Sequence, residues 1–278
     1  RRVCYIPAGN VLQQTISIPT TTAKYFRVTV KNPPPRFSFA SITGNNAAPQ
    51  TPPGTEISEL VLHPASRIHQ FEEKAAFATG GNFYEQATPE TDDVIKETDI
   101  INITDRVTND GTLHWGIPKG NWKIIRYGYS LTGKQNHPAS AEATGLEVDK
   151  LNPKAVAAYF NNYLDQYKEA TSGLMGTRGL RYMVTDSWEA GTQNWTNRLP
   201  EEFMKRRGYN IFQWMPALSG FIIRSAGATE NFLWDFRKTI SELTTENHYD
   251  LLTKLLEERG MKRYSESHES GRATVADG

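Results

Sequence analysis

The spacing of apolar and polar residues changes along the chain, and the first part has the character of β structure. Up to about residue 128, apolar residues alternate with polar ones in short runs, as at residues 15–18 and 25–30. Proline-rich breaks such as residues 33–35 separate these runs, a rhythm typical of a β-sandwich. We expect further strands at residues 59–62, 101–103 and 122–127, and a turn at Asn109-Asp110-Gly111.

After residue 138 the apolar positions follow helical spacing instead. Asn152 and Pro153 predict the start of a helix, because asparagine is a good cap and proline suits the first turn. Gly173 is expected to end this helix. Its predicted apolar face comprises Val156, Tyr159, Phe160, Tyr163 and Tyr167.

Two further helical stretches lie between two short runs with the character of strands, the first of which is expected to be buried. The runs are residues 180–185 and 261–264. Between them we expect a short helix at residues 200–207, ended by Gly208, and a long helix that Thr229 caps. The long helix has Phe232, Leu233, Phe236, Ile240 and Leu243 on one side, and Leu251, Leu252, Leu255 and Leu256 continue it to Gly260.

The order of these elements predicts an α/β fold joined to an all-β part. Helices that alternate with strands favour a parallel sheet, and acidic residues directly after the strands favour a (β/α)8 TIM-type barrel over an open sheet. We predict a β-sandwich-like domain at residues 1–120 and part of the barrel at residues 121–278. Because roughly three βα units fit here and a barrel needs eight, we expect the chain to be a piece of a longer protein.

Composition argues against several classes of partner. Lys and Arg number 31 against 31 Asp and Glu, and no basic stripe appears, so we expect no nucleic acid as partner. No apolar run approaches the roughly 20 residues that span a bilayer, so no membrane span is expected. The single Cys4 excludes an intrachain disulfide and a zinc site of several cysteines. A neutral ligand suits this chain better.

The residues that suit catalysis gather in two acidic clusters, each directly after a predicted strand. The clusters are Asp186-Ser187-Trp188-Glu189 and Ser265-Glu266-Ser267-His268-Glu269. Paired carboxylates at the carboxyl ends of parallel strands suit the protonation of a glycosidic oxygen and the activation of a water. Carbohydrate is therefore the expected substrate, and Trp188 and Trp195 are candidates to stack on a sugar ring.

Glu189 is the candidate general acid, because the neighbouring Trp188 lowers the local polarity and so raises the pKa of a carboxyl group. The alternative is that Glu189 caps the turn or pairs with Arg198. In the second cluster, alternation along an extended segment turns Glu266 and His268 to one side and Glu269 to the other. Glu266 is then the better base, and a solvated charged turn is the alternative.

The same acids also raise the question of a metal. Asp186, Glu266 and Glu269 would make an oxygen-rich site that suits Ca²⁺ rather than Zn²⁺, and such an ion would clamp vicinal sugar hydroxyls. Alternatively the acids serve only as hydrogen-bond acceptors. His268 lies in no HExxH pattern, so zinc is not expected.

Three stretches carry a resemblance to a known family: Trp115-Gly116-Ile117-Pro118-Lys119-Gly120-Asn121-Trp122, residues 125–139 and Gly145-Leu146-Glu147-Val148-Asp149-Lys150. Together they resemble the entry to the catalytic domain of glycoside hydrolase family 106, the α-L-rhamnosidases, and the resemblance covers about residues 100–278. It implies a long bacterial enzyme that is periplasmic or extracellular. Such an enzyme would remove terminal α-L-rhamnose from plant or complex polysaccharides, with other domains of the same protein around its barrel.

The resemblance also implies an inverting mechanism with two glutamates and a calcium ion. It makes Glu189 the acid and assigns the base or a calcium-ligand role to Glu266 or Glu269. The candidate catalytic residues are thus Glu189 and Glu266, and the candidate calcium ligands are Glu266 and Glu269. The candidate substrate-binding residues are Asp186, Trp188, Asn136, His268 and Glu147. Asp149 also matches the entry motif, although Asp149-Lys150 is equally interpretable as a structural pair at a helix start.

Two other functions stay open on the sequence. The first is a carbohydrate-binding module without catalysis, in which the acidic clusters hold calcium structurally. The second is a retaining barrel glycosidase of the β-galactosidase type. Inversion predicts carboxyl groups ~6.5–9.5 Å apart, whereas retention predicts ~5 Å.

Overall fold

The computed structural model describes residues 2–6, 12–31, 57–79, 87–136, 139–186, 188 and 190–265. The helices are α1 (Phe71–Lys74), α2 (Pro153–Ala170), α3 (Leu199–Arg207), α4 (Ala226–Thr244) and α5 (Leu251–Glu257), with the π-helical turn η9 (Thr245–Asp250) between α4 and α5. Short 3-10 helices are η3 (Glu97–Asp99), η4 (Thr104–Arg106), η5 (Ala141–Ala143), η6 (Gly176–Arg178), η7 (Ile211–Gln213) and η8 (Met215–Ser219). The strands are β1 (Tyr182–Thr185) and β2 (Lys262–Ser265).

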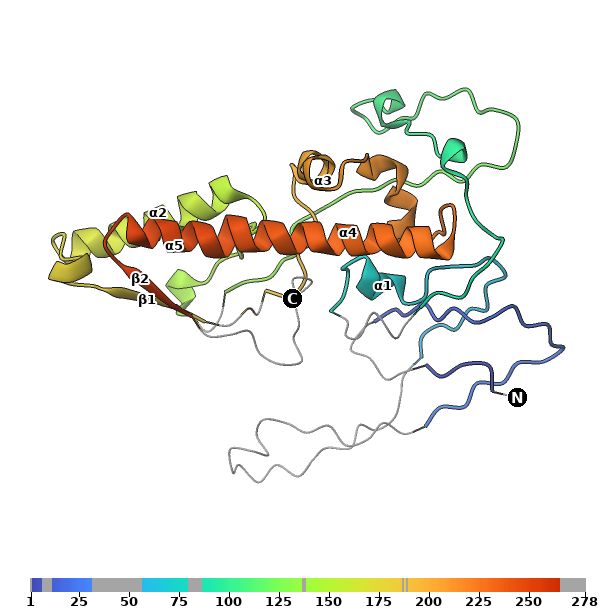
Figure 1. Ribbon diagram of the computed structural model, residues 1–278, viewed down its shortest axis with the longest axis horizontal. Coiled ribbons are helices and arrows are strands. Elements are labelled where there is room, and N and C mark those ends of the chain that lie inside the picture. Colours follow the sequence, from blue (N-terminus) through green and yellow to red (C-terminus); the bar gives the residue numbers. More distant parts are fainter. Residues whose placement is uncertain are drawn as a thin grey trace.

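The segments α4, η9 and α5 follow one another without a break and form a rod that crosses the molecule. Figure 1 shows α2 and the two strands near one end of this rod, and α3 and α1 beside its other half. The rod contributes buried residues to two hydrophobic cores, α4 to one and α5 to the other. Among the described residues, no helix has the combination of length and apolar character that crossing a bilayer requires.

The larger core lies at the α3 end of the rod and is rich in aromatic rings. Phe203 of α3 and Phe232 of α4 are buried with their ring centroids 5.8 Å apart, and Trp214 stacks on Phe232 at 5.5 Å. The second core lies at the α2 end. It contains Val156, Phe160, Leu164, Leu252, Leu255, Leu256 and Met261.

Several local predictions are confirmed by the backbone. Asn152 caps α2, since its side-chain oxygen accepts from the N–H of Lys154 at 3.0 Å. Gly208 follows α3 with a φ of 80°, and Gly111 closes the predicted turn with a φ of 86°. These positions take left-handed conformations that glycine adopts without steric cost. Gly173, also left-handed, follows the end of α2 and donates to the carbonyl of Lys168 at 2.7 Å.

The predicted apolar face of α2 is wrong in part. Val156, Phe160 and Leu164 are buried against α5, whereas the three tyrosines are exposed. Tyr159 precedes Phe160 by one residue, so it projects about 100° away around the helix. The tyrosines therefore form a separate exposed stripe, which comprises Tyr159, Tyr163 and Tyr167.

The predicted start of the long helix is also wrong. Ser225 caps α4, with its hydroxyl accepting from the N–H of Ala228 at 3.0 Å. Thr229 lies inside the first turn, where its buried hydroxyl bonds the N–H and the carbonyl of Ile223 at 2.8 and 2.9 Å. Both Ser225 and Thr229 carry a hydroxyl that can bond a free backbone group, so the sequence alone did not show which of them caps α4. The apolar side that the sequence predicts for this helix is buried as expected.

The two predicted strands of the α/β part are confirmed as strands, and they pair in parallel, but the predicted burial of residues 180–185 is wrong because only one face of the sheet is covered. Tyr182 pairs with Lys262, and the register ends with Thr185 opposite Ser265. Met183 packs on the second core, which lies under α2 and α5. The other face of the sheet is exposed, with Tyr182, Val184 and Tyr264 each at least 60% accessible.

The strands predicted between residues 15 and 127 are wrong as local elements. Their described residues form no strand, and the pairings found there are isolated bridges such as Val107 with Leu113. Alternation makes the backbone extended, but a strand also needs a hydrogen-bonded neighbour, and the side chains of Val28 and Leu62 are exposed. The sandwich, the domain boundary at residues 120/121 and the complete barrel are larger assemblies, and they stay predictions.

Candidate functional site

The parallel strands bring the starts of both acidic clusters to one edge of the sheet. Thr185 and Ser265 form the last pair of the register, and their hydroxyls are hydrogen-bonded at 2.7 Å. Asp186 follows Thr185 directly, and Glu266 follows Ser265. Figure 1 shows β1 and β2 side by side beneath α5. Both clusters thus begin at the carboxyl edge, where parallel-sheet enzymes place their catalytic residues.

Part of the predicted site lies outside the described residues. This holds for Glu189, Glu266, His268 and Glu269, whose roles stay predictions. Asp186, Trp188, Asn136 and Glu147 are described. Arg198, the alternative partner of Glu189, lies 3.8 Å from Glu202.

Asp186 continues the alternation of β1. Tyr182 and Val184 are exposed on the sheet face away from α2 and α5, while Met183 and Thr185 are half-buried on the other side. A period of two assigns Asp186 to the exposed face, and its side chain is exposed. This carboxylate is therefore accessible to a ligand at the edge of the sheet.

Trp188 anchors the acid loop, which we define as residues 186–196. Its side chain is only 8% exposed, and its indole N–H donates to the carbonyl of Gly191 at 2.8 Å. The ammonium of Lys150 lies 5.1 Å from the ring centroid, a cation–π contact. The ring of His248 meets it edge-on at 6.2 Å. This packing gives Trp188 a supporting position, and sugar contact by its ring stays a prediction.

Trp195, the other candidate for sugar stacking, lies at the far end of the acid loop. It is half-buried and packs against the larger core. Tyr129 lies 6.5 Å from it, ring to ring, and donates its hydroxyl hydrogen to the side chain of Asn197. The acid loop thus reaches from the ring of His248 to the larger core.

The entry segment, which we define as residues 145–150, is hydrogen-bonded to the acid loop. The N–H of Lys150 donates to the side-chain oxygen of Gln193 at 3.2 Å, and the hydroxyl of Thr196 donates to Asp149 at 2.8 Å. Asp149 also accepts from the N–H of Leu151 at 3.1 Å, just before α2. Asp149 therefore has a structural role, and the two segments that carry the motifs form one unit.

Glu147 is paired within this unit. Its carboxylate contacts the ammonium of Lys150, which is buried and lies over Trp188. The pair neutralises the buried charge of Lys150 beside the acid loop. Burying this ammonium without a partner would cost free energy. A contact between Glu147 and substrate stays a prediction.

Asn136 shapes the loop that leads into the entry segment. Its side-chain oxygen accepts from the N–H of Gly145 at 2.8 Å, and its amide donates to the carbonyl of Ala143 at 3.1 Å. Gln135 and Leu146 form an isolated bridge next to it. Since both ends of its amide have partners in its own loop, Asn136 holds that loop closed.

Sequence reasoning missed His248, which η9 places against the acid loop. Its ring lies 6.0 Å from Phe160 as well as 6.2 Å from Trp188. Burial first, and then the charges of Lys150 and Arg263, lower the pKa of His248 to about 4. The signal in the sequence is the polar run from Thr244 to Asp250, which interrupts the apolar side of the long helix.

No group of three or more potential metal ligands occurs within the described ranges. The candidate ligands Glu266 and Glu269 lie outside those ranges, so the calcium site stays a prediction. The donors at the sheet edge are the carboxylate of Asp186 on the exposed face and, on the opposite face, the hydroxyls of Thr185 and Ser265. A carboxylate is a hard oxygen donor, the kind that suits Ca²⁺.

Comparison with known proteins places this geometry in a family. The sequence model of glycoside hydrolase family 106, described as alpha-L-rhamnosidase, matches residues 8–278. A protein of Formosa agariphila with the name "Putative beta-glucuronidase" is 41% identical over 169 residues, which are 61% of this chain. The structure of a rhamnosidase from Novosphingobium sp. PP1Y is 36% identical and superposes with a TM-score of 0.67 over 74% of this chain.

Both relatives are much longer than the matched region. The match covers 14% of the Formosa agariphila protein and 20% of the Novosphingobium rhamnosidase chain. The similarity therefore concerns one portion of each relative.

Proposed function

Because this chain belongs to glycoside hydrolase family 106, the α-L-rhamnosidases, we propose that it forms part of a site that removes terminal α-L-rhamnose from plant or complex polysaccharides. The observation that carries this proposal is the parallel pairing of β1 with β2. This pairing places the first residues of both acidic clusters at one edge of the sheet. The exposed Asp186 at that edge supports it. The substrate is a carbohydrate.

In the proposed reaction, Glu189 protonates the departing glycosidic oxygen. Glu266 takes a proton from the water that attacks the anomeric carbon from the opposite side, so that the configuration inverts. The burial of Trp188 supports this assignment, because an apolar neighbour raises the pKa of a carboxyl group and keeps it protonated near neutral pH.

Asp186 and His268 would bind sugar hydroxyls beside these acids. Glu266 and Glu269 would hold the calcium ion, which supplies a positive charge that fixes vicinal hydroxyls. Support for this set comes from the exposed carboxylate of Asp186 at the sheet edge.

We also propose that the two strands belong to a (β/α)8 barrel completed by other parts of the same protein. Parallel sheets occur almost only with both faces covered, yet Tyr182, Val184 and Tyr264 expose one face here. Two strands are also too few for an independently stable sheet. Neighbouring strands would cover this face, and the enzyme would act in the periplasm or outside the cell.

The test is the substitution Glu189→Gln in the complete natural protein that contains this sequence. Activity on a natural rhamnoside should fall by roughly 100-fold or more, the usual contribution of a general acid. An aryl rhamnoside with a very good leaving group needs little protonation and should lose much less. Glu257→Gln, an exposed site on α5, is the matched control and should leave both activities unchanged. An equal loss on both substrates would contradict the acid role.

The name of the Formosa agariphila relative makes β-glucuronide hydrolysis the second candidate. Turnover of aryl α-L-rhamnoside and aryl β-D-glucuronide, compared side by side, decides between the sugars. Following the anomeric configuration of the first product by NMR separates inversion from the retention of a β-galactosidase-type enzyme. Binding of glycans by calorimetry without turnover would favour a carbohydrate-binding module.

A further inference from the structure

We propose that His248 positions the acid loop, through its contact with Trp188 and through a hydrogen bond that its Nδ1 makes with this loop during turnover. The inference rests on the proposed function, since it concerns the loop that carries Glu189. His248 is here a positioning residue, because it acts through its neighbours and not on the sugar.

The first observation is the helical geometry around His248. Thr245–Asp250 is a π-helix between two α-helices, and such turns occur frequently at functional sites. Hydrogen bonds join this turn to two other segments of the chain. Asn247 donates to the carbonyl of Leu151 at 2.9 Å, and Arg263 of β2 donates to the carbonyl of Tyr249 at 3.2 Å. His248 is therefore held in place between the start of α2 and the second strand.

The second observation is the position of the imidazole ring. It lies between Phe160 of α2 and Trp188 of the acid loop, with centroid distances of 6.0 and 6.2 Å. The interplanar angle to Trp188 is 87°, an edge-on arrangement that aromatic pairs favour. A shift of this ring would displace Trp188 and the carbonyl of Gly191 to which its indole is hydrogen-bonded.

The third observation is a buried nitrogen without a partner. The Nδ1 atom of His248 is inaccessible to solvent and makes no hydrogen bond within the part of the chain that the structure describes. An unpaired buried polar atom costs free energy that an apolar ring at the same place would avoid. Such an atom in a native protein calls for an explanation, and a functional role is a common one. The acid loop is the adjacent segment that would supply its partner.

The charges around the ring agree with this role. Burial disfavours a positive charge on His248 most, and the charges of Lys150 in the entry segment and Arg263 in β2 disfavour it further. Glu147 pairs with Lys150, and the guanidinium of Arg263 lies 5.3 Å from the ring of Tyr249. The imidazole is thus kept neutral, and a neutral ring keeps one nitrogen free to accept a hydrogen bond.

The test compares His248→Phe with His248→Asn in the complete natural protein. Phenylalanine keeps the ring but removes Nδ1, so we expect kcat on a natural rhamnoside to fall about ten-fold, with KM within about two-fold and an undiminished melting temperature. The loss should be smaller on an aryl rhamnoside with a very good leaving group. Asparagine places a polar group near the position of Nδ1, so it should restore part of kcat. His114→Phe, an exposed site, is the control and should change none of these values.

Two outcomes would overturn the inference. One is an unchanged kcat for His248→Phe; the other is an equal loss on both substrates together with a lower melting temperature, which would indicate a structural role only. Glu189→Gln is measured in the same assays. If that variant keeps full activity, the proposed function fails, whereas loss in Glu189→Gln without loss in His248→Phe defeats only the role of His248.

Discussion

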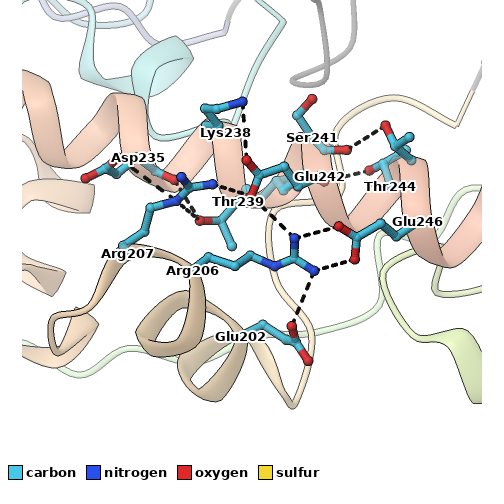
Figure 2. Close-up of polar contacts among 12 residues, drawn as sticks. Glu202, Arg206, Arg207, Asp235, Lys238, Thr239, Ser241, Glu242, Thr244 and Glu246 are labelled. Carbon is cyan, nitrogen blue, oxygen red and sulfur yellow. Dashed lines mark hydrogen bonds and ion pairs between the residues drawn. The ribbon is translucent and has the colours of Figure 1, made fainter.

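The two halves of the rod formed by α4, η9 and α5 differ in how their polar groups are satisfied. At the α3 end, arginines and carboxylates pair across the helices, as Figure 2 shows, although the Nε atom of Arg206 is buried without a partner among the described residues. At the α2 end, Lys150 and Arg263 both disfavour a positive charge on a histidine whose Nδ1 has no partner in the described part of the chain and no neighbouring carboxylate that offsets them. The first arrangement stabilises the contact between helices. The second costs stability beside the acid loop, and proteins tolerate such a cost mainly at functional sites.

The ion pairs of the α3 end are specific in geometry. The two terminal nitrogens of Arg206 bind the two carboxylate oxygens of Glu246 at 2.7 and 2.5 Å, a bidentate contact. Arg207 pairs with Glu242, which also lies 3.2 Å from Lys238. These pairs join α3 to the rod near the place where α4 passes into η9.

The largest expected effect comes from breaking the core at the α3 end. Phe232→Ala removes a ring that is 1% exposed and that contacts Trp214 and Phe203. The free energy of unfolding should fall by about 3–5 kcal/mol, because the cavity cannot fully collapse. Urea denaturation measures this loss. A change below about 1 kcal/mol would show that this ring is not packed as closely as its contacts indicate.

The next effect is a pH dependence at the α2 end. The pKa of His248 is about 4 in the folded protein against an ordinary 6.5. As the pH falls below 6.5, the unfolded chain takes up a proton that the folded chain refuses, so stability is lost down to about pH 4. By pH 5 this loss amounts to about 2 kcal/mol. The free energy of unfolding of the wild type should therefore drop between pH 7 and 5 by about that much more than the value for His248→Phe. If the free energy of unfolding depended on pH in the same way for the wild type and for His248→Phe, this prediction would be contradicted.

A smaller effect of similar sign is expected at the α3 end. Arg207, through its hydrogen bond, lowers the pKa of Glu242 to about 2. This carboxylate contributes stability above its ordinary pKa of 4.5, and the contribution disappears as the pH falls through about 2. Screening by solvent reduces it to about 1 kcal/mol. Glu242→Gln should therefore cost about 1 kcal/mol at pH 7 and nothing at pH 2, as measured by urea denaturation at both values.

The smallest effect concerns the exposed stripe of α2. Tyr163→Phe removes the hydroxyl that bonds Tyr167 at 3.1 Å. An exposed site of this kind should change the free energy of unfolding by at most about 0.5 kcal/mol. Thermal unfolding of the complete natural protein tests this. A loss above about 1 kcal/mol would show that another part of the protein covers the tyrosines.

The features that the sequence predicted depend on one or two residues or on a single period. Asn152 with Pro153 marks the start of α2, Gly208 ends α3, and the two strands directly precede the acids. Each of these signals acts locally, so no distant contact can reverse it easily. The alternation of helices with strands indicates a parallel sheet. In such a sheet the carboxyl ends of neighbouring strands lie next to each other, so their adjacency could also be predicted.

The features that the sequence did not predict depend on partners that lie elsewhere in the chain. The strands of the first 127 residues need neighbours that alternation cannot identify. The exposure of Tyr159 depends on which side of α2 meets α5. His248 was missed because its position depends on a π-helical turn, whereas the expected helix was α-helical throughout. The acids Glu189 and Glu266 lie outside the described residues, so their convergence stays a prediction.

The π-helical turn also makes this chain more sensitive to a change of length than to a change of residue. α4 ends on the buried Leu243 and Thr244, and α5 buries Leu252, Leu255 and Leu256 in the core under α2. The i→i+5 hydrogen bonds of η9 enclose one more residue per turn than those of an α-helix. Deleting one residue of η9 would turn α5 by about 100° relative to α4. Leu252 and Leu256 would then leave α2, and among related sequences this turn should tolerate substitutions far better than insertions or deletions.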